Sequence, residues 1–409
     1  MNKIPFGLFL VAMCLGCVAQ NGDRPAHAEH GAPPVPQGRD MKWKATLAKP
    51  SLAVTAMYDE NGRLWQTLIR DRHLYVSHSD DRGTVMSAPV KVNAEPEDIL
   101  ADGENRPKIV VRKGVIYVSY TQGLAKPMSG DIRFSRSTDG GKTFSGPVTV
   151  NDNREVISHR FETMGVNDRG QVFLAWLDKR DLSAAARQGE KYAGAAVYYA
   201  VSDDGGASFR PNVKVADHSC ECCRVAMAMD MDGSPVILWR HIFDKNTRDH
   251  ALLRLDGAAA PVRASQDDWR VDGCPHHGPA LSIGPDGVYH LAWFTGASGR
   301  AGLYYRRSHD RGKSFTVPMR FGNPDAQPGR PQVLSLGSRV VLVWKEFDGK
   351  SSLVRAMGSR GGGATWSAPE TLARTAGASD HPQLLHDRGH VFLGWQTANE
   401  GFRLIEVGT

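Results

Sequence analysis

Short apolar runs separated by turn residues recur along most of the chain, and their spacing predicts its architecture. Seven segments share one form: a short strand, a Gly-, Asp- or Asn-rich turn, and a second strand rich in Val, Ile, Leu and aromatic residues. This form is typical of a β-hairpin. The segments start about 50 to 65 residues apart, which leaves room for two more strands per unit and predicts four-stranded propeller blades. They begin at Ser51, Arg106, Arg160, Arg224, Gly278, Arg330 and His381.

A second repeat, S-x-D-x-G-x-S/T-F/W, falls between the third and fourth strands of several units. Well-formed copies are STDGGKTF (137–144), SDDGGASF (202–209) and SHDRGKSF (308–315), with looser copies SDDRGTVM (79–86) and SRGGGATW (359–366). We expect the Asp side chain to accept hydrogen bonds from backbone N–H groups, the Gly to adopt positive φ, and the aromatic side chain to pack between strands. This motif is the Asp box. With the blade period, it makes the chain resemble the sialidase-like (BNR repeat) β-propeller superfamily, which implies an all-β fold with a single propeller over residues 41–409.

The number of blades follows from the number of first strands. Seven units are present, but the last has only three strands before Thr409. The alternating segment MKWKATLA (41–48) is a candidate for its missing outer strand. Sialidases have six blades, so six remains the alternative if residues 51–93 are irregular.

The N-terminal pattern predicts export. Lys3 precedes an apolar run from Ile4 to Met13, too short for a comfortable membrane span and suited to a cleaved signal over residues 1–19. The sequence CLGC resembles a lipobox in which Cys17 carries the lipid; cleavage after Ala19 is the alternative. A Pro- and Gly-rich tether follows over residues 20–40. We therefore expect a periplasmic protein or an outer-membrane-anchored lipoprotein that meets the membrane only through Cys17.

Composition and charge narrow the partners. The 409 residues are 41% hydrophobic and 23% charged, which is ordinary for a globular protein. The 50 Lys and Arg against 44 Asp and Glu give a net charge of +6, a mild and dispersed excess. This excess suits an anionic small molecule or glycan but is too small to indicate nucleic acid. No cofactor is predicted.

Arg and His collect at equivalent positions of different units. In a propeller, the loops entering the first strands share one face with the loops after the second strands, and the Asp boxes lie opposite. Planar guanidinium donors at such a face suit a carboxylate, sulfate or phosphate. The alternative is that each Arg pairs with a neighbouring blade's carboxylate and staples the ring. The predicted ligand-binding residues are Arg106, Arg160, Arg224, Arg330, His159, His277 and His381.

The resemblance also implies an activity. Sialidases hold the sugar carboxylate with three arginines and use a Tyr nucleophile, a Glu and an Asp acid/base, outside the two-carboxylate glycosidase pattern. Of their F/Y-R-I-P motif the chain keeps only NRPKI, in which Arg106 matches. Candidate catalytic acids on the predicted face are Asp102, with Glu104 beside it, and Glu346. Exo-sialidase activity is thus an expectation, and a non-catalytic binding or assembly propeller is the alternative.

Four cysteines follow the signal region, at the starts of two neighbouring blades. CECCR supplies Cys220, Cys222 and Cys223, and GCPHHGP supplies Cys274. Oxidation on export predicts a disulfide from Cys222 or Cys223 to Cys274. The rival interpretation is a copper site formed by these four cysteines with His276 and His277. The C-x-C-C spacing departs from C-x2-C, and Met227, Met229 and Met231 alternate as packing residues do, so the disulfide is favoured over the metal.

Overall fold

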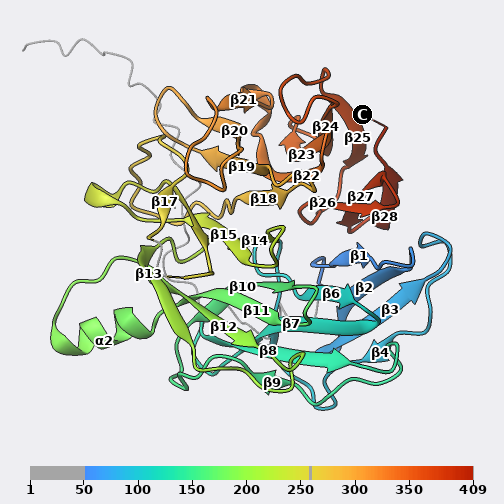
Figure 1. The fold of residues 1–409 in the computed structure, drawn as a ribbon, viewed down its shortest axis with the longest axis vertical. Helices are drawn as coiled ribbons and strands as arrows, with labels where there is room; N and C mark the ends of the chain where they lie inside the picture. Colours follow the sequence, from blue (N-terminus) through green and yellow to red (C-terminus); the bar gives the residue numbers. More distant parts are fainter. Residues whose placement is uncertain (1–50, 258–259, 409) are drawn as a thin grey trace, which may run out of the picture. The chain divides into compact units, whose positions relative to one another are not determined.

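The computed structural model describes residues 51–257 and 260–408, which form seven antiparallel sheets in chain order (Figure 1). The first two sheets contain β1 (Ala56–Tyr58), β2 (Leu64–Arg70), β3 (His73–Ser79) and β4 (Val90–Lys91), then β5 (Ile99–Leu100), β6 (Lys108–Arg112), β7 (Val115–Gly123), β8 (Gly130–Ser137) and β9 (Val148–Thr149). The third and fourth contain β10 (His159–Val166), β11 (Val172–Asp178), β12 (Ala195–Ser202) and β13 (Val213–Ser219), then β14 (Ala226–Met229), β15 (Pro235–Arg240), β16 (His250–Arg254) and β17 (Val262–Arg263).

The remaining three sheets continue the same meander. The fifth contains β18 (Ala280–Ile283), β19 (Tyr289–Thr295), β20 (Gly302–Ser308) and β21 (Met319–Phe321). The sixth contains β22 (Gly329–Leu336), β23 (Arg339–Phe347), β24 (Ser352–Ser359) and β25 (Glu370–Thr375), and the seventh contains β26 (Gln383–Asp387), β27 (His390–Thr397) and β28 (Gly401–Glu406). Between strands lie the helix α2 (Arg180–Gln188) and two short 3-10 helices, η1 (Asp244–Asn246) and η2 (Pro324–Ala326).

The sheets are blades around a central channel. The inner strands β1, β6, β10, β14, β18, β22 and β26 contact one another in that order, and β26 contacts β1 to close the ring (Figure 1). The protein is therefore a seven-bladed β-propeller, and the six-bladed alternative is wrong. The seventh blade has three strands among the described residues. The candidate outer strand at 41–48, the export signal, Cys17 and the tether all lie outside the described residues.

A buried tryptophan near the end of the second strand recurs in five blades. Each is 0–1% exposed, and each indole N–H donates a hydrogen bond, for example to Asp178 or Glu346. A large apolar side chain fills the wedge between blades, and its polar edge needs an acceptor when buried. The five residues are Trp176, Trp239, Trp293, Trp344 and Trp395.

The predicted Asp boxes form the turns before the outer strands. In the first well-formed copy, the Asp139 carboxylate accepts the backbone N–H of Thr143 at 3.0 Å, and the Ser137 hydroxyl accepts the N–H of Gly141 at 2.9 Å. The Asp204 and Asp310 boxes repeat these bonds. Because the strands are antiparallel, these turns share a face with the β-hairpin turns, as predicted, and leave the opposite face to the other loops.

Irregular backbone occurs where the inner strands begin. In the second blade β5 and β6 both pair with β7, and the loop 101–107 leaves the sheet between them. In the third and sixth blades the ladder is shifted between Arg160 and Thr163 and between Gly329 and Gln332, with positive φ at Phe161 and Arg330. Such bulges re-aim side chains at the end of a strand. Within 51–257 and 260–408, no helix has the length and hydropathy needed to cross a membrane.

Candidate functional site

Ten charged side chains meet where the inner strands begin, and we call this group the channel mouth. The acids are Asp102, Glu104, Glu162 and Asp380, and the bases are Arg106, Lys108, Arg160, Arg224, Arg330 and Lys345. All four predicted arginines belong to it. Beneath them the channel holds a cavity of about 250 Å³ lined by Glu104, Arg106 and Lys108.

Glu104 is the hub of the channel mouth. Its side chain is 4% exposed, and its Oε1 accepts from Arg224 Nη1 at 2.9 Å and from Arg330 Nη1 at 3.1 Å. Its Oε2 accepts the backbone N–H groups of Arg224 at 3.0 Å and Gly278 at 2.9 Å. His381 Nδ1 lies 3.6 Å from Oε1. One carboxylate of the second blade thereby contacts the fourth, fifth, sixth and seventh blades.

Two glycines make this close packing sterically possible. A Cβ on Gly278 would lie 2.6 Å from Glu104 Oε2 and 2.2 Å from Arg224 Cγ. A Cβ on Gly103 would lie 2.5 Å from the His381 ring. Gly278, the second glycine of GCPHHGP, is therefore required by the close approach of the Glu104 carboxylate.

Arg106 staples the second blade to the seventh. Its Nη2 lies 3.0 Å from Asp380 Oδ2 and donates to the His381 carbonyl, while its Nη1 donates to the Val54 carbonyl. Burial raises the pKa of Asp380, and the charge of Arg106 opposes that shift. Arg106 therefore pairs with a carboxylate of another blade, in line with the alternative interpretation of the arginines. Arg224 and Arg330 do the same through their ion pairs with Glu104.

Arg160 is different, because no acid of the described chain lies within ion-pair distance of it. It is 6% exposed, its Nη1 lies 3.5 Å from Met128 Sδ, and its guanidinium lies over the Phe161 ring at 4.8 Å. Its buried Nε has no hydrogen-bond partner among the described residues. Burial lowers its pKa, and Asp102 and Glu162 oppose this from a distance. A buried guanidinium left in this way suits an anion supplied from outside.

The channel mouth is net basic. Six basic groups face four acids, while burial keeps the pKa values of His277 and His381 well below the usual range, so both imidazoles are neutral. Burial, followed by the charge of Arg330, lowers the pKa of Lys345 to about 8. Its ammonium donates to the Ser379 hydroxyl at 2.8 Å. Lys345 is therefore charged at neutral pH but titrates just above it.

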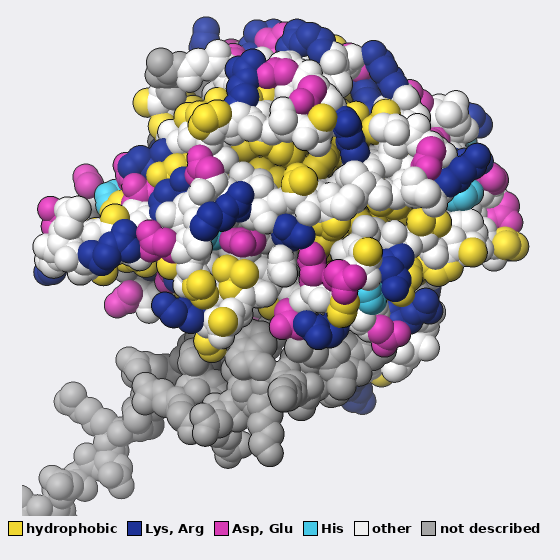
Figure 2. Space-filling model, turned by 90° about the horizontal axis from the view of Figure 1, so that it is seen from below, with side chains coloured by type: hydrophobic (Ala, Val, Ile, Leu, Met, Phe, Trp, Pro, Cys, Tyr) yellow, Lys and Arg dark blue, Asp and Glu magenta, His cyan; other side chains and the backbone are white. Residues whose placement is uncertain are grey.

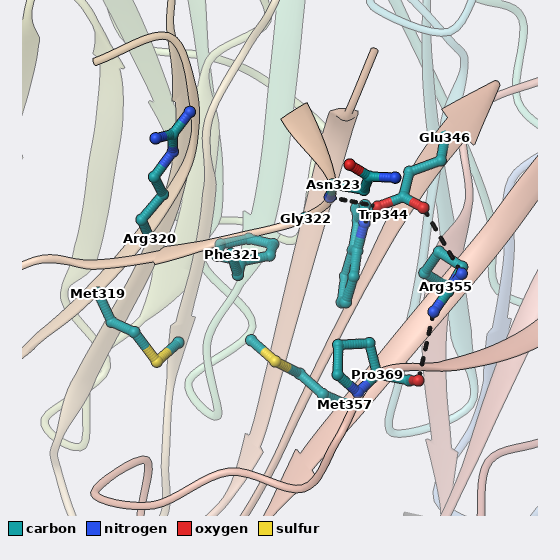
Figure 3. A pocket seen from close by; sticks show the side chains of 10 residues that line it. All are labelled: Met319, Arg320, Phe321, Gly322, Asn323, Trp344, Glu346, Arg355, Met357 and Pro369. Carbon is teal, nitrogen blue, oxygen red and sulfur yellow. Dashed lines mark hydrogen bonds and ion pairs between the residues drawn. The ribbon is translucent and has the colours of Figure 1, made fainter. Parts of the chain in front are cut away.

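Glu346 does not lie at the channel mouth, which corrects its assignment as a catalytic candidate there. Figure 3 shows it lining a separate cavity of about 430 Å³, where it accepts from the Trp344 indole at 2.7 Å and the Asn323 N–H at 2.8 Å. Arg355 lies 3.7 Å from its second oxygen. Side chains alternate along β23, so Lys345 faces the channel mouth and Glu346 faces away.

Three other residues predicted to belong to the site make contacts that stabilise the fold. His159 is fully buried, with Nδ1 3.0 Å from the Gly130 carbonyl, and does not reach the channel mouth. Asp102 is exposed there, but its Oδ1 accepts the N–H groups of Glu104 and Asn105 and shapes the loop. His277 stacks on Phe294 with ring centroids 4.0 Å apart.

The four cysteines of the described chain are unpaired thiols. Cys220, Cys222 and Cys223 are buried, and Cys274 is exposed. The disulfide to Cys274 is not formed in the structure and stays a prediction. The three buried Sγ atoms lie 3.7, 3.8 and 3.9 Å apart, so the C-x-C-C loop gathers all three sulfurs. His276 is exposed and does not join them.

A larger cleft adjoins the same loop. It measures about 1020 Å³ and is lined by polar, charged and aromatic side chains that include Phe243, His241 and Arg248. Glu221 lines this cleft, whereas Arg224 of the same loop reaches the channel mouth. On the side shown in Figure 2, basic and acidic side chains are intermixed over the surface.

The sequence signals for Glu104 and the sulfur cluster were present but weak. An acid in an irregular loop looks like a solvated side chain, and only the ring reveals that Gly278 and Arg224 surround it. Lys108 was missed because an alternating strand residue gives no sign that it faces a channel.

Comparisons with known proteins bear on the fold. No protein-family model matches the sequence, and no curated protein matches it. Among solved structures, a lectin from Burkholderia pseudomallei matches with a TM-score of 0.58 at 10% identity, over 87% of this chain and 99% of the lectin. An ulvan lyase matches with a TM-score of 0.57 at 12% identity, over 88% of this chain and 92% of the lyase. A Hadza microbial sialidase matches with a TM-score of 0.47 at 14% identity, over 83% of this chain and 74% of the sialidase.

At these identities the likeness shows the fold alone. The seven-bladed ring and its Asp-box turns confirm the β-propeller fold and the turn motif predicted from the sequence.

Proposed function

We propose that this protein binds an anionic carbohydrate at the channel mouth. The observation that carries the proposal is Arg160, a buried guanidinium without an acidic partner in the described chain, within a mouth of six bases and four acids. Arg330 adds to it, because only Nη1 of its guanidinium is used by Glu104 and its side chain is 24% exposed. Two guanidinium groups with unused N–H donors suit the paired oxygens of a carboxylate or sulfate.

The structural neighbours support a carbohydrate as the carrier of that anion. One match is a lectin, and another is an ulvan lyase solved with a ligand of GlcA and Rha3S, which carries a carboxylate and a sulfate. The polar cleft at Glu221, in the same loop as Arg224, is large enough for further sugar residues, and Phe243 offers a ring on which a sugar face can pack.

Binding to uronate-bearing, sulfated and neutral polysaccharides tests this proposal. We expect binding to the first two and little to the neutral one, with an affinity that falls as salt is raised. Arg160→Ala should weaken binding about tenfold, or about 1.4 kcal/mol, because a charged hydrogen-bonding partner is lost without breaking an internal ion pair.

The matched control is Arg360→Ala, which removes an exposed arginine from a turn on the Asp-box face. It should bind like the unaltered protein, and both variants should keep the same thermal midpoint. Equal binding by the two variants, or equal binding of neutral and anionic polymers, would contradict the proposal.

Hydrolysis of a sialoside remains the more specific expectation from the resemblance. Asp102 is the exposed acid of the channel mouth, whereas each tyrosine of the described chain that hydrogen-bonds an acid does so within or between blades, as Tyr120 does with Glu97. Incubation with a fluorogenic sialoside separates the two outcomes: turnover lost in Asp102→Asn supports an enzyme, and binding without turnover supports a lectin-like protein.

We also propose that the protein works outside the cytoplasm. The support is the apolar run from Ile4 to Met13 and the CLGC sequence. Cell fractionation with metabolic lipid labelling tests it: Cys17→Ser should abolish labelling if Cys17 is the anchor, and an unprocessed cytoplasmic chain would contradict export.

A further inference from the structure

The buried sulfurs of Cys220, Cys222 and Cys223 form an equilateral triangle. Their separations of 3.7, 3.8 and 3.9 Å are nearly equal, and the three residues are 1–3% exposed. Three sulfurs bonded to one ion at about 2.3 Å would lie about 3.8 Å apart in tetrahedral and about 4.0 Å apart in trigonal geometry. The observed triangle has the dimensions of a thiolate metal site.

The surroundings are those of a closed site. Phe161, Val225 and Trp239 pack in the same core as the cysteines. Arg248 is 9% exposed, and its Nη1 donates to Cys220 Sγ at 3.3 Å. No acid of the described chain forms an ion pair with Arg248, so its charge is available to stabilise a thiolate.

The loop is built to hold this arrangement. The backbone N–H of Cys220 donates to the Arg240 carbonyl at 2.9 Å, which anchors the first cysteine to β15. Arg240 itself donates to the His277 carbonyl of the Cys274 loop at 3.0 Å. Cys222 and Cys274 lie close enough for each thiol to shift the pKa of the other, so the exposed cysteine lies near the triangle. The two cysteine motifs therefore meet at one point.

The methionines are not part of this group. The sulfurs of Met227 and Met229 lie over Gly165 of the third blade, where a Cβ would approach them to 2.8 and 2.6 Å. They pack between blades, as their alternation predicts. The candidate donors are therefore the four thiols.

We propose that Cys220, Cys222 and Cys223 bind one thiolate-preferring ion, Zn²⁺ or Cu⁺, with Cys274 as a fourth, exchangeable ligand. Each thiol that binds releases its proton to solvent, so no oxidant or reductant is consumed. The site goes beyond the carbohydrate proposal and stands without it. It would also tie together the two loops that place Arg224 and Gly278 on Glu104.

The test uses the full chain carrying Cys14→Ser and Cys17→Ser, so that a thiol count concerns only the four cysteines of the propeller. After anaerobic loading with Zn²⁺ or Cu⁺ and removal of excess metal, we expect one ion per chain and slow reaction of the buried thiols with a thiol reagent. Chelation should restore fast reaction. Co²⁺ in place of Zn²⁺ should give a sulfur-to-metal charge-transfer band. Competition with a Cu⁺ chelator measures the affinity of the site for Cu⁺.

Variants then assign the ligands. Cys223→Ser should lose the ion, Cys274→Ser should bind it more weakly, and Met227→Leu should keep it. Should Cys223→Ser fail to fold, the chelation experiment on the parent chain still decides the question. A folded parent chain that retains neither ion while all four thiols react overturns the proposal, as does a mapped disulfide among the three buried cysteines in protein isolated without added oxidant.

Discussion

At the scale of single residues, four arginines at equivalent positions of their blades differ in role. Arg106, Arg224 and Arg330 each contact a carboxylate contributed by another blade, Asp380 or Glu104, and so hold the ring together. Arg160 has no such partner among the described acids. The sequence pattern predicted that all four arginines lie at the channel mouth. Only the contacts in the structure show which of them are held in ion pairs between blades and which, like Arg160, are not.

Lys345 makes anion binding at the channel mouth sensitive to pH. Its pKa of about 8 means that its ammonium is charged below this pH and neutral above it. We expect the affinity for an anionic polysaccharide to fall by about 1 kcal/mol as the pH is raised through this value, because one charge-assisted interaction disappears. Titration calorimetry across that range measures the effect.

Two substitutions at the same position provide the control. Lys345→Arg should keep its charge and bind with little pH dependence, whereas Lys345→Met should bind weakly at every pH. A parent protein whose affinity is flat between pH 7 and 9, about one unit either side of the pKa of Lys345, would rule out its contribution.

At the scale of elements, the Asp box depends on glycine as much as on aspartate. Gly140 and Gly141 are adjacent and both have positive φ, 75° and 83°. A Cβ on Gly140 meets nothing within 4 Å, while one on Gly141 lies 2.9 Å from the Trp65 ring of the neighbouring blade. The pair separates the cost of the backbone conformation from the cost of crowding between blades.

Alanine at these two positions should therefore have unequal effects. Gly140→Ala should lower the free energy of unfolding by about 1 kcal/mol through backbone strain alone. Gly141→Ala should lower it by about 2–4 kcal/mol, because the Trp65 ring must also shift. Denaturant unfolding of both variants measures the difference. Equal losses in the free energy of unfolding would contradict the prediction, because they would mean that the Trp65 ring moves aside at no energetic cost.

Sequence patterns predicted the elements better than the site. Strand alternation, Gly turns and Asp boxes are local, so the blades and their number could be read directly. Glu346 was misplaced because its neighbour Lys345 faces the channel mouth, and one residue along a strand reverses the face. The sequence pattern indicated the cysteines only as the rival metal site, because the triangle of three buried sulfurs depends on how the loop from Cys220 to Cys223 folds.

At the scale of the whole molecule, one glutamine joins the two ends of the ring. The Gln383 Oε1 accepts the N–H of Ala56 at 3.2 Å, and its Nε2 donates to the Val54 carbonyl at 2.5 Å. Gln332 occupies the same place in the R-P-Q sequence of the sixth blade, and its side chain makes no hydrogen bond to the described residues. Among the described residues, Gln383 thus joins the seventh blade to the first by a bond for which Gln332 has no counterpart.

Gln383→Leu should loosen this closure. We expect a loss of about 1–3 kcal/mol in the free energy of unfolding, because the N–H of Ala56 loses its partner and the Val54 carbonyl keeps only its bond from Arg106. Gln332→Leu should change it by less than about 0.5 kcal/mol, the range of substitutions that remove no contact. Hydrogen exchange at the Ala56 amide should be faster in Gln383→Leu but not in Gln332→Leu. Unchanged exchange at Ala56 in Gln383→Leu would contradict the role of Gln383 in closing the ring.

The Glu104 hub has a consequence for the order of folding. Its partners Arg224, Gly278 and Arg330 lie 120, 174 and 226 residues further along the chain. Contacts that span so much sequence form after local hairpins, and here they require the fourth to sixth blades to be in place. Glu104→Gln should therefore cost about 3 kcal/mol and speed unfolding while leaving the folding rate nearly unchanged, as stopped-flow kinetics can show. The carboxylate would then act as a latch that keeps a completed ring from opening.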